Sequence, residues 1–137
     1  MHGGNGNDDL TGTDRVDTIF GDAGDDIISA GGSDDRITGG AGDDTISGGS
    51  GADTAVFASP LGDIEIEDIA SSFGAPFAPT FDATISGPEG RDVLSGIEAL
   101  EFAGLEYRVV LGSAGDDIVD DDPNARYLIF GFGGYDR

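Results

Sequence analysis

The nine residues Gly39-Gly40-Ala41-Gly42-Asp43-Asp44-Thr45-Ile46-Ser47 decide the fold of this chain. Written in nines, the surrounding sequence repeats their pattern in six consecutive units, GGNGNDDLT (3–11), GTDRVDTIF (12–20), GDAGDDIIS (21–29), AGGSDDRIT (30–38), GGAGDDTIS (39–47) and GGSGADTAV (48–56). The sixth place of every unit is aspartate, and the eighth place is always apolar. Agreement at both columns across all units indicates a structural repeat, because low-complexity sequence would not keep this phase.

Each unit combines a turn with a short strand. The glycines in its first half permit positive φ and tight turns, and its second half is a three-residue strand with one inward apolar residue. The inward residues are Leu10, Ile19, Ile28, Ile37, Ile46 and Ala55. Repetition of a turn and a strand winds the chain into a parallel solenoid with two units per coil, so strands of alternate units stack about 4.8 Å apart. We therefore expect an all-β fold, with a parallel β-roll over residues 3–56.

The same stacking brings acidic side chains together. Turns of alternate units lie above one another, and tight turns also expose backbone carbonyls. The predicted carboxylate pairs are Asp8 with Asp26, Asp26 with Asp44, Asp17 with Asp35, and Asp35 with Asp53. Two carboxylates and several carbonyls form an all-oxygen cage. Such a cage suits calcium, which takes roughly six to eight oxygen ligands at about 2.3–2.6 Å, better than octahedral magnesium.

Composition supports a cation as the partner. The 137 residues carry 28 acidic and 6 basic side chains, for a net charge of -22. This charge argues against binding to nucleic acid or to an anionic membrane, and no apolar run is long enough to be inserted in a membrane. Low hydrophobicity with high net charge is typical of disorder when no metal is bound. Since the chain has no cysteine, metal is the expected substitute for disulfides.

The consensus G-G-x-G-x-D-x-U-x resembles that of the RTX (repeats-in-toxin) family, also called haemolysin-type calcium-binding repeats. Units 3–11 and 39–47 match it fully. The resemblance implies a β-roll, secretion through a type I exporter, and folding triggered by extracellular calcium. It also implies that the sixth-place aspartates and the carbonyls of the first four places bind the ions. The carbonyl positions are Gly4, Gly6, Gly21, Asp22, Ala23, Gly24, Ala30, Gly31, Gly32, Ser33, Gly39, Ala41, Gly48 and Ser50.

Two units depart from the family pattern. In unit 12–20, Thr13, Asp14 and Arg15 replace small residues, so we expect the site between Asp17 and Asp35 to be the weakest. Unit 30–38 looks offset, with alanine in its first place and serine in its fourth.

After Val56 the period stops, and a more ordinary β pattern follows. We expect strands at 63–67, 81–86 and 93–102, a turn at 87–90 and a loop at 71–80. Residues 91–102 resemble the D-x-L-x-G-I-E-x-L-x-F segment that follows RTX arrays, which implies that they close the open end of the roll. Residues 57–111 are therefore expected to form a β-stranded cap.

The repeat returns as GSAGDDIVD (112–120) and continues, degenerate, to Arg137. Asp117 and Asp136 stand two units apart and form one more candidate site, which gives about four to five calcium ions in all. We expect residues 112–137 to be a truncated second array. On this interpretation the chain is a fragment of a larger secreted protein, and Met1-His2 is a cloning start.

Other functional classes fit the sequence less well. Catalysis is not expected, because the one histidine is His2, cysteine is absent, and the non-periodic Glu98 and Glu101 belong to the cap motif. Asp116, Asp120 and Asp122 lack the loop pattern of an EF-hand.

One alternative remains open, that of an adhesive or polysaccharide-binding module in a secreted adhesin or carbohydrate-active enzyme. Its arginines (Arg36, Arg91, Arg108 and Arg126) would contact an anionic polysaccharide. The rest of the parent protein is the other candidate partner.

Overall fold

The computed structural model describes residues 1–72, 80–111 and 126–130. The first part is built from short strands that alternate between two sheets, namely β1 (His2–Asn5), β2 (Asp9–Thr11), β3 (Thr18–Ala23), β4 (Ile27–Gly32), β5 (Arg36–Ala41), β6 (Thr45–Ser50) and β7 (Thr54–Phe57). A 3-10 turn, η1 (Leu61–Asp63), follows. The later strands are β8 (Glu65–Ser72), β9 (Thr80–Gly87), β10 (Gly90–Ile97), β11 (Ala99–Phe102), β12 (Leu105–Leu111) and β13 (Tyr127–Phe130).

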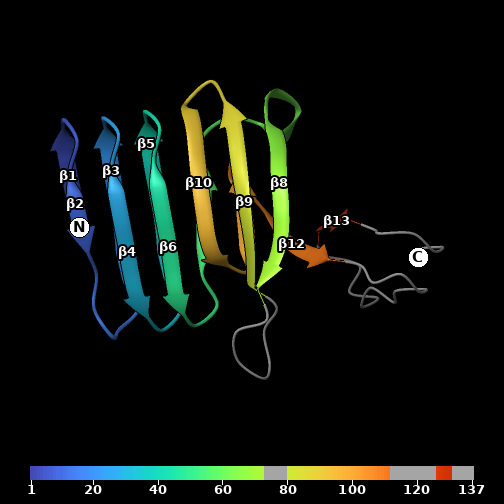
Figure 1. Ribbon diagram of the computed structural model, residues 1–137, viewed down its shortest axis with the longest axis horizontal. Helices are drawn as coiled ribbons and strands as arrows, with labels where there is room; N and C mark the ends of the chain where they lie inside the picture. The colour runs from blue at the N-terminus through green and yellow to red at the C-terminus, as the bar shows by residue number, and fades with distance from the viewer. Residues whose placement is uncertain (73–79, 112–125, 131–137) are drawn as a thin grey trace.

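The strands form two sheets, with the orders β1-β3-β5-β7-β11-β12-β13 and β2-β4-β6-β10-β9-β8. The second sheet lies across the front of Figure 1 with its strands side by side in that order. Pairing within the repeats is parallel and joins each unit to the next but one, as in Asp9↔Ile27 and Ile27↔Thr45. The expected parallel β-roll is confirmed, with the seventh to ninth places of odd-numbered units in one sheet and those of even-numbered units in the other.

The eighth-place side chains form two buried ladders between the sheets. One ladder runs Leu10, Ile28, Ile46 and Leu94, and the other runs Ile19, Ile37, Ala55 and Leu100. These side chains are at most 9% exposed, and burial of each larger one stabilises the fold by roughly 1.5–3 kcal/mol. The seventh place points outward, as in Ile27, which is 55% exposed. The core is therefore one side chain wide in each sheet.

The segment after the repeats extends both sheets. β10 pairs in parallel with β6, and β11 pairs in parallel with β7. Beyond them the pairing is antiparallel, through β9 and β8 in one sheet and β12 in the other. Two stacked rings, Phe57 and Phe102 with centroids 5.4 Å apart, thicken the core where the roll meets this extension.

Three expectations for this segment change. The single strand expected at 93–102 is wrong, because β10 ends at Ile97 and β11 begins at Ala99 in the other sheet, just after an irregularity in β10 at Gly96 (φ +61). The strand expected at 63–67 begins at Glu65, after η1. Of the loop expected at 71–80, the two ends lie in β8 and β9, and residues 73–79 lie outside the described residues. The turn at 87–90 is confirmed as the link between β9 and β10.

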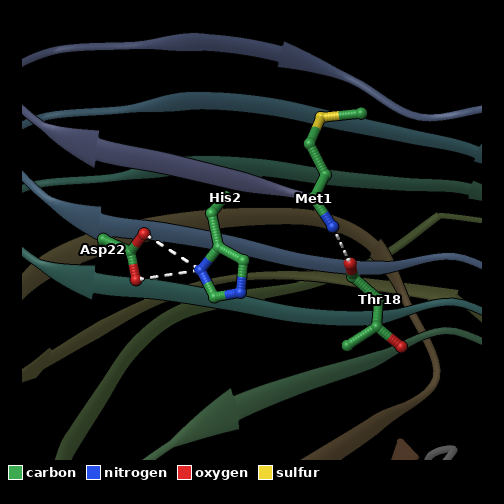
Figure 2. Close-up of polar contacts among 4 residues, drawn as sticks. All are labelled: Met1, His2, Thr18 and Asp22. Carbon is green, nitrogen blue, oxygen red and sulfur yellow. Dashed lines mark hydrogen bonds and ion pairs between the residues drawn. The ribbon is translucent and has the colours of Figure 1, made fainter.

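Met1 and His2 are part of the first coil. The Met1 amino group donates to the Thr18 carbonyl (2.6 Å), and His2 Nδ1 lies 3.1 Å from Asp22 Oδ2, as Figure 2 shows. The His2 ring also stacks on Phe20, with centroids 4.5 Å apart. The first strand therefore packs on β3 as later coils pack on one another.

Candidate metal sites

The sixth-place aspartates form two continuous stacks. The backbone N–H of Asp8 donates to Oδ1 of Asp26 (2.8 Å), and that of Asp26 donates to Oδ1 of Asp44 (2.9 Å). The even-numbered units repeat this contact from Asp17 to Asp35 (2.7 Å) and from Asp35 to Asp53 (2.8 Å). All four pairs expected from the repeat are therefore neighbours in space.

The second oxygen of most of these carboxylates has no partner. Oδ2 is buried without a hydrogen bond among the described residues in Asp8, Asp26, Asp35, Asp44 and Asp53. Four of these side chains, all but Asp8, are at most 2% exposed. A buried carboxylate oxygen without a partner is strongly destabilising. Its recurrence in each stack therefore indicates places where a positively charged group would stabilise the fold.

Backbone carbonyls lie next to these oxygens. A Cβ built on Gly3 would lie 2.7 Å from the Gly21 carbonyl and 2.8 Å from Asp8 Oδ2. The same two kinds of oxygen converge on Gly21, where they come from Gly39 and Asp26. The first-place glycines therefore leave a cradle that is lined by a carboxylate oxygen and the carbonyl of the next coil.

The other carbonyls expected as ligands divide into two groups. Those of the second and fourth places lie close beneath glycines of the next coil, as Asp22 lies beneath Gly40 and Gly24 beneath Gly42. The third-place carbonyls of Ala23 and Ala41 instead accept hydrogen bonds from the backbone N–H groups of Gly6 and Gly24 (2.7 and 2.8 Å). The third place therefore serves the ladder between coils, and its carbonyls have only one lone pair left for an ion.

Unit 12–20 is the exception in the structure too. Oδ2 of Asp17 accepts hydrogen bonds from the backbone N–H and the hydroxyl of Thr13, both at 2.7 Å. These two bonds lower the pKa of Asp17. Asp17 Oδ2 is therefore already satisfied, unlike Oδ2 of the other five sixth-place aspartates among the described residues.

Unit 30–38, in contrast, keeps the phase of the others. Gly31 and Ser33 both have positive φ (112° and 75°), as the second and fourth places have in unit 39–47. The expected offset of this unit is therefore wrong, because its backbone has positive φ at the same places as unit 39–47. Ser33 adopts a left-handed conformation that ordinarily favours glycine.

A second ladder runs through the fifth place in the opposite direction. There the side chain accepts from the following coil, since the N–H of Asp25 donates to Asn7 Oδ1 and that of Asp43 donates to Asp25 Oδ1, both at 3.0 Å. These side chains are exposed. The fifth place therefore has a structural partner and open solvent, whereas the sixth place has a buried, unpaired oxygen.

Sequence reasoning missed two carboxylates that join the stacks. Asp44 N–H donates to Oδ1 of Asp92 (2.9 Å), and Asp53 N–H donates to Oε2 of Glu98 (2.6 Å). Oε1 of Glu98 is buried without a hydrogen-bond partner among the described residues. A signal was present, because Asp92-Val93-Leu94 and Glu98-Ala99-Leu100 both repeat the acid-x-aliphatic triplet of the units.

The stacked carboxylates become harder to keep charged toward the cap. Burial raises the pKa of Asp35, Asp44 and Asp53. Burial also raises the pKa of Asp92 and of Glu98 to about 7, with the neighbouring carboxylates Asp44 and Asp53 adding to the effect. A nearby cation would stabilise the charged carboxylates and so oppose both effects on the pKa.

These positions fit calcium. Among the residues that the structure describes, no three acidic or histidine side chains converge on one point. The ligands at each position are instead carboxylates from two coils together with backbone carbonyls. Oxygen-only ligands of this kind are those that a hard cation prefers. When bound, calcium would supply the positive charge that the buried Oδ2 atoms lack. Asp117 and Asp136 lie outside the described residues.

The fold and the paired stacks define a β-roll of the calcium-binding type. The model of the RTX calcium-binding nonapeptide repeat, in four copies, matches residues 2–35 and 27–55. Residues 2–55 are thus an array of RTX repeats, as the sequence predicted. A comparison with curated proteins finds no match to the chain.

Among solved structures, the chain is similar to the extracellular lipase LipA from Serratia marcescens. The two sequences are 18% identical, and the TM-score is 0.34. The similarity covers 96% of this chain but 22% of the lipase, so the chain spans only about a fifth of that protein's length. Within the described residues, no helix is long and apolar enough to cross a membrane.

Proposed function

We propose that this chain is the calcium-binding module of a secreted protein, that it folds when extracellular calcium fills the two carboxylate stacks, and that it has no catalytic activity of its own. The observation that carries the proposal is the buried, unpaired Oδ2 that recurs in five of the six units. These oxygens lie beside backbone carbonyls, so the described residues supply oxygen ligands but no hydrogen-bond partner for the buried Oδ2 atoms.

The energetics favour a metal-dependent fold. One inward aliphatic per unit gives roughly 1.5–3 kcal/mol, whereas fixing the backbone of one residue costs about 1–2 kcal/mol before hydrogen bonds form. Calcium at about ten times its dissociation constant adds about 1.4 kcal/mol per site. Four to five such sites would add roughly 6–7 kcal/mol, comparable with the whole stability of a small domain.

Secretion through a type I exporter follows from the same proposal. Extracellular calcium sites bind in the range of about 10⁻⁴–10⁻³ M, so the sites would stay empty in a cytosol and fill after export. We further propose the division into a roll (3–56), a cap (57–111) and the start of a second array (112–137). The polysaccharide alternative loses one of its arginines, because Arg36 forms a bidentate ion pair with Glu101.

Circular dichroism of the whole chain tests the proposal. In excess EDTA we expect the β spectrum of residues 3–56 to be lost, with partial signal remaining from the antiparallel strands β8 and β9. Calcium should restore the spectrum at millimolar or lower concentration, and magnesium at the same concentration should not. An unchanged β spectrum in excess chelator would refute metal-dependent folding.

A further inference from the structure

Residues 87–95, Gly-Pro-Glu-Gly-Arg-Asp-Val-Leu-Ser, occupy the position of a seventh repeat unit. Their last three residues continue the parallel ladder on unit 39–47, with Val93↔Thr45, Leu94↔Ile46 and Ser95↔Ser47. Asp92 stands 48 residues beyond Asp44, where successive units of the stack are 18 apart. The hairpin of β8 and β9 is thus inserted between two coils, and the roll resumes after it.

The turn of this unit makes the contacts of a repeat turn. Gly42 N–H donates to the Glu89 carbonyl (2.8 Å), as Gly24 N–H donates to Ala41. Gly90, in the fourth place, has φ +142°, against +133° for Gly42. In the fifth place, Arg91 N–H donates to Asp43 Oδ1 (2.9 Å), continuing that ladder. From its third place to its ninth, the segment therefore follows the repeat.

The even-numbered stack ends in a similar way on a shorter turn. The Glu98 side chain accepts a hydrogen bond from the Asp53 N–H. The Asp53 carbonyl accepts hydrogen bonds from the N–H groups of Glu98 and Ala99 (both 3.1 Å). A Cβ built on Gly48 would lie 2.6 Å from Asp53 Oδ2 and against the Gly96 carbonyl. Gly96 therefore provides the oxygen that a first-place residue provides elsewhere, in the same cradle as that at Gly3.

We propose, on the basis of the function proposed above, that Asp92 and Glu98 are calcium ligands and that each completes a terminal site, one with Asp44 and one with Asp53. Asp44 and Asp53 are at most 1% exposed, and each has an Oδ2 without a partner among the described residues, next to the first-place glycine of its own unit (Gly39 and Gly48). Without the two added carboxylates, each stack would end on an aspartate that faces no partner. The last two calcium ions thus hold the cap on the roll.

The terminal sites differ from the others in two ways. Proline fixes φ near −65°, so Pro88 cannot adopt the positive φ that Gly40 has in the second place (116°). The backbone of the second place therefore has a different conformation at the Asp44 site. At the Asp53 site, glutamate replaces aspartate, and its longer side chain compensates for the shorter turn through Gly96. Both changes concern ligand geometry and leave the charge of the site unaltered.

The test counts calcium ions bound per chain by equilibrium dialysis. Asp92→Asn and Glu98→Gln each keep an oxygen that can accept the Asp44 or Asp53 N–H but remove the charge. We expect each variant to bind one ion fewer than the wild-type chain. Glu67→Gln, at an exposed position on β8, is the matched control and should bind the full number. Wild-type stoichiometry and affinity in both variants would overturn the inference, whereas a wild-type chain that binds no calcium would overturn the proposed function as well.

A second measurement decides the matter if the variants do not fold. Terbium(III) replaces calcium in the folded wild-type chain, and its paramagnetism broadens nearby amide signals in NMR spectra. We expect the Val93 and Ala99 signals to broaden together with those of Ile27 and Thr45 in the roll. Broadening confined to the roll would overturn the inference while leaving the proposed function standing.

Discussion

Replacement of Asp26 by asparagine separates its role as a calcium ligand from its role in the backbone ladder. Asp26 stands in two pairs, one with Asp8 and one with Asp44. Asparagine keeps Oδ1, which accepts the Asp8 N–H, and replaces the unpaired Oδ2 by a neutral amide. The variant should therefore retain the ladder but lose affinity for calcium at one or both pairs.

The expected magnitude follows from mass action. At calcium about ten times its dissociation constant, each lost site removes about 1.4 kcal/mol, so Asp26→Asn should lower the free energy of unfolding by about 1.4–2.8 kcal/mol. For a chain of this length, that corresponds to a decrease in Tm of about 5–10 °C. The assay is thermal unfolding at that calcium concentration, monitored by far-ultraviolet circular dichroism.

Asp9→Asn is the matched control, because Asp9 is exposed in the neighbouring column and the change of charge is the same. Its effect should stay within about 0.5 kcal/mol. Asp43 would be a poorer control, since its Oδ1 accepts the Arg91 N–H. Asp17→Asn should have a smaller effect than Asp26→Asn, because Thr13 already satisfies Asp17. Equal decreases in Tm for Asp26→Asn and Asp9→Asn would contradict the reasoning.

Three other outcomes are expected. Gly42→Ala should destabilise the chain by more than about 1 kcal/mol in calcium, because φ is +133° and the added Cβ would meet the Gly24 carbonyl. Gly62→Ala is the control, since its Cβ would meet nothing within 4 Å. Equal urea midpoints for the two variants would count against this prediction. In EDTA, residual structure should weaken as the pH rises from about 4 to about 7. The reason is that the raised pKa values of Asp92 and Glu98 make the folded chain bind protons more tightly than the unfolded chain. Circular dichroism at several pH values checks this, and a rise in structure over the same interval would contradict it. Arg36→Ala should lower stability by only about 0.2–1 kcal/mol, since its ion pair with Glu101 is partly exposed; a larger decrease in the urea midpoint would show that the pair does more than join the roll to the cap.

Much of the roll could be predicted because its interactions have a fixed spacing in the sequence. Each unit contacts the unit 18 residues away, so one period of nine residues determines which strands pair, which side chains point inward and which aspartates meet. The expectation of a weak position at Asp17 and Asp35 had the same origin, since Thr13 visibly replaces a small residue. The structure adds that the Thr13 hydroxyl and N–H both donate to Asp17, and weaker calcium binding at this pair stays a prediction.

The cap could not be predicted in the same way. The strand expected at 93–102 divides at Glu98, because alternation of polar and apolar residues does not show which sheet a strand joins. Glu98 was assigned to a cap motif, although its side chain occupies the position of a sixth-place aspartate.

The sequence by itself thus determined the parallel roll and its two aspartate stacks, because these depend on a local period and on the side chains that the period brings together. Only the tertiary structure decided where the stacks end. Because the hairpin of β8 and β9 is inserted, Asp92 follows Asp44 by 48 residues and Glu98 follows Asp53 by 45, whereas neighbours within each stack are 18 residues apart. Hydrogen bonding to β6 and β7 restores them to register in space, and that restoration leaves no trace in the spacing of the sequence.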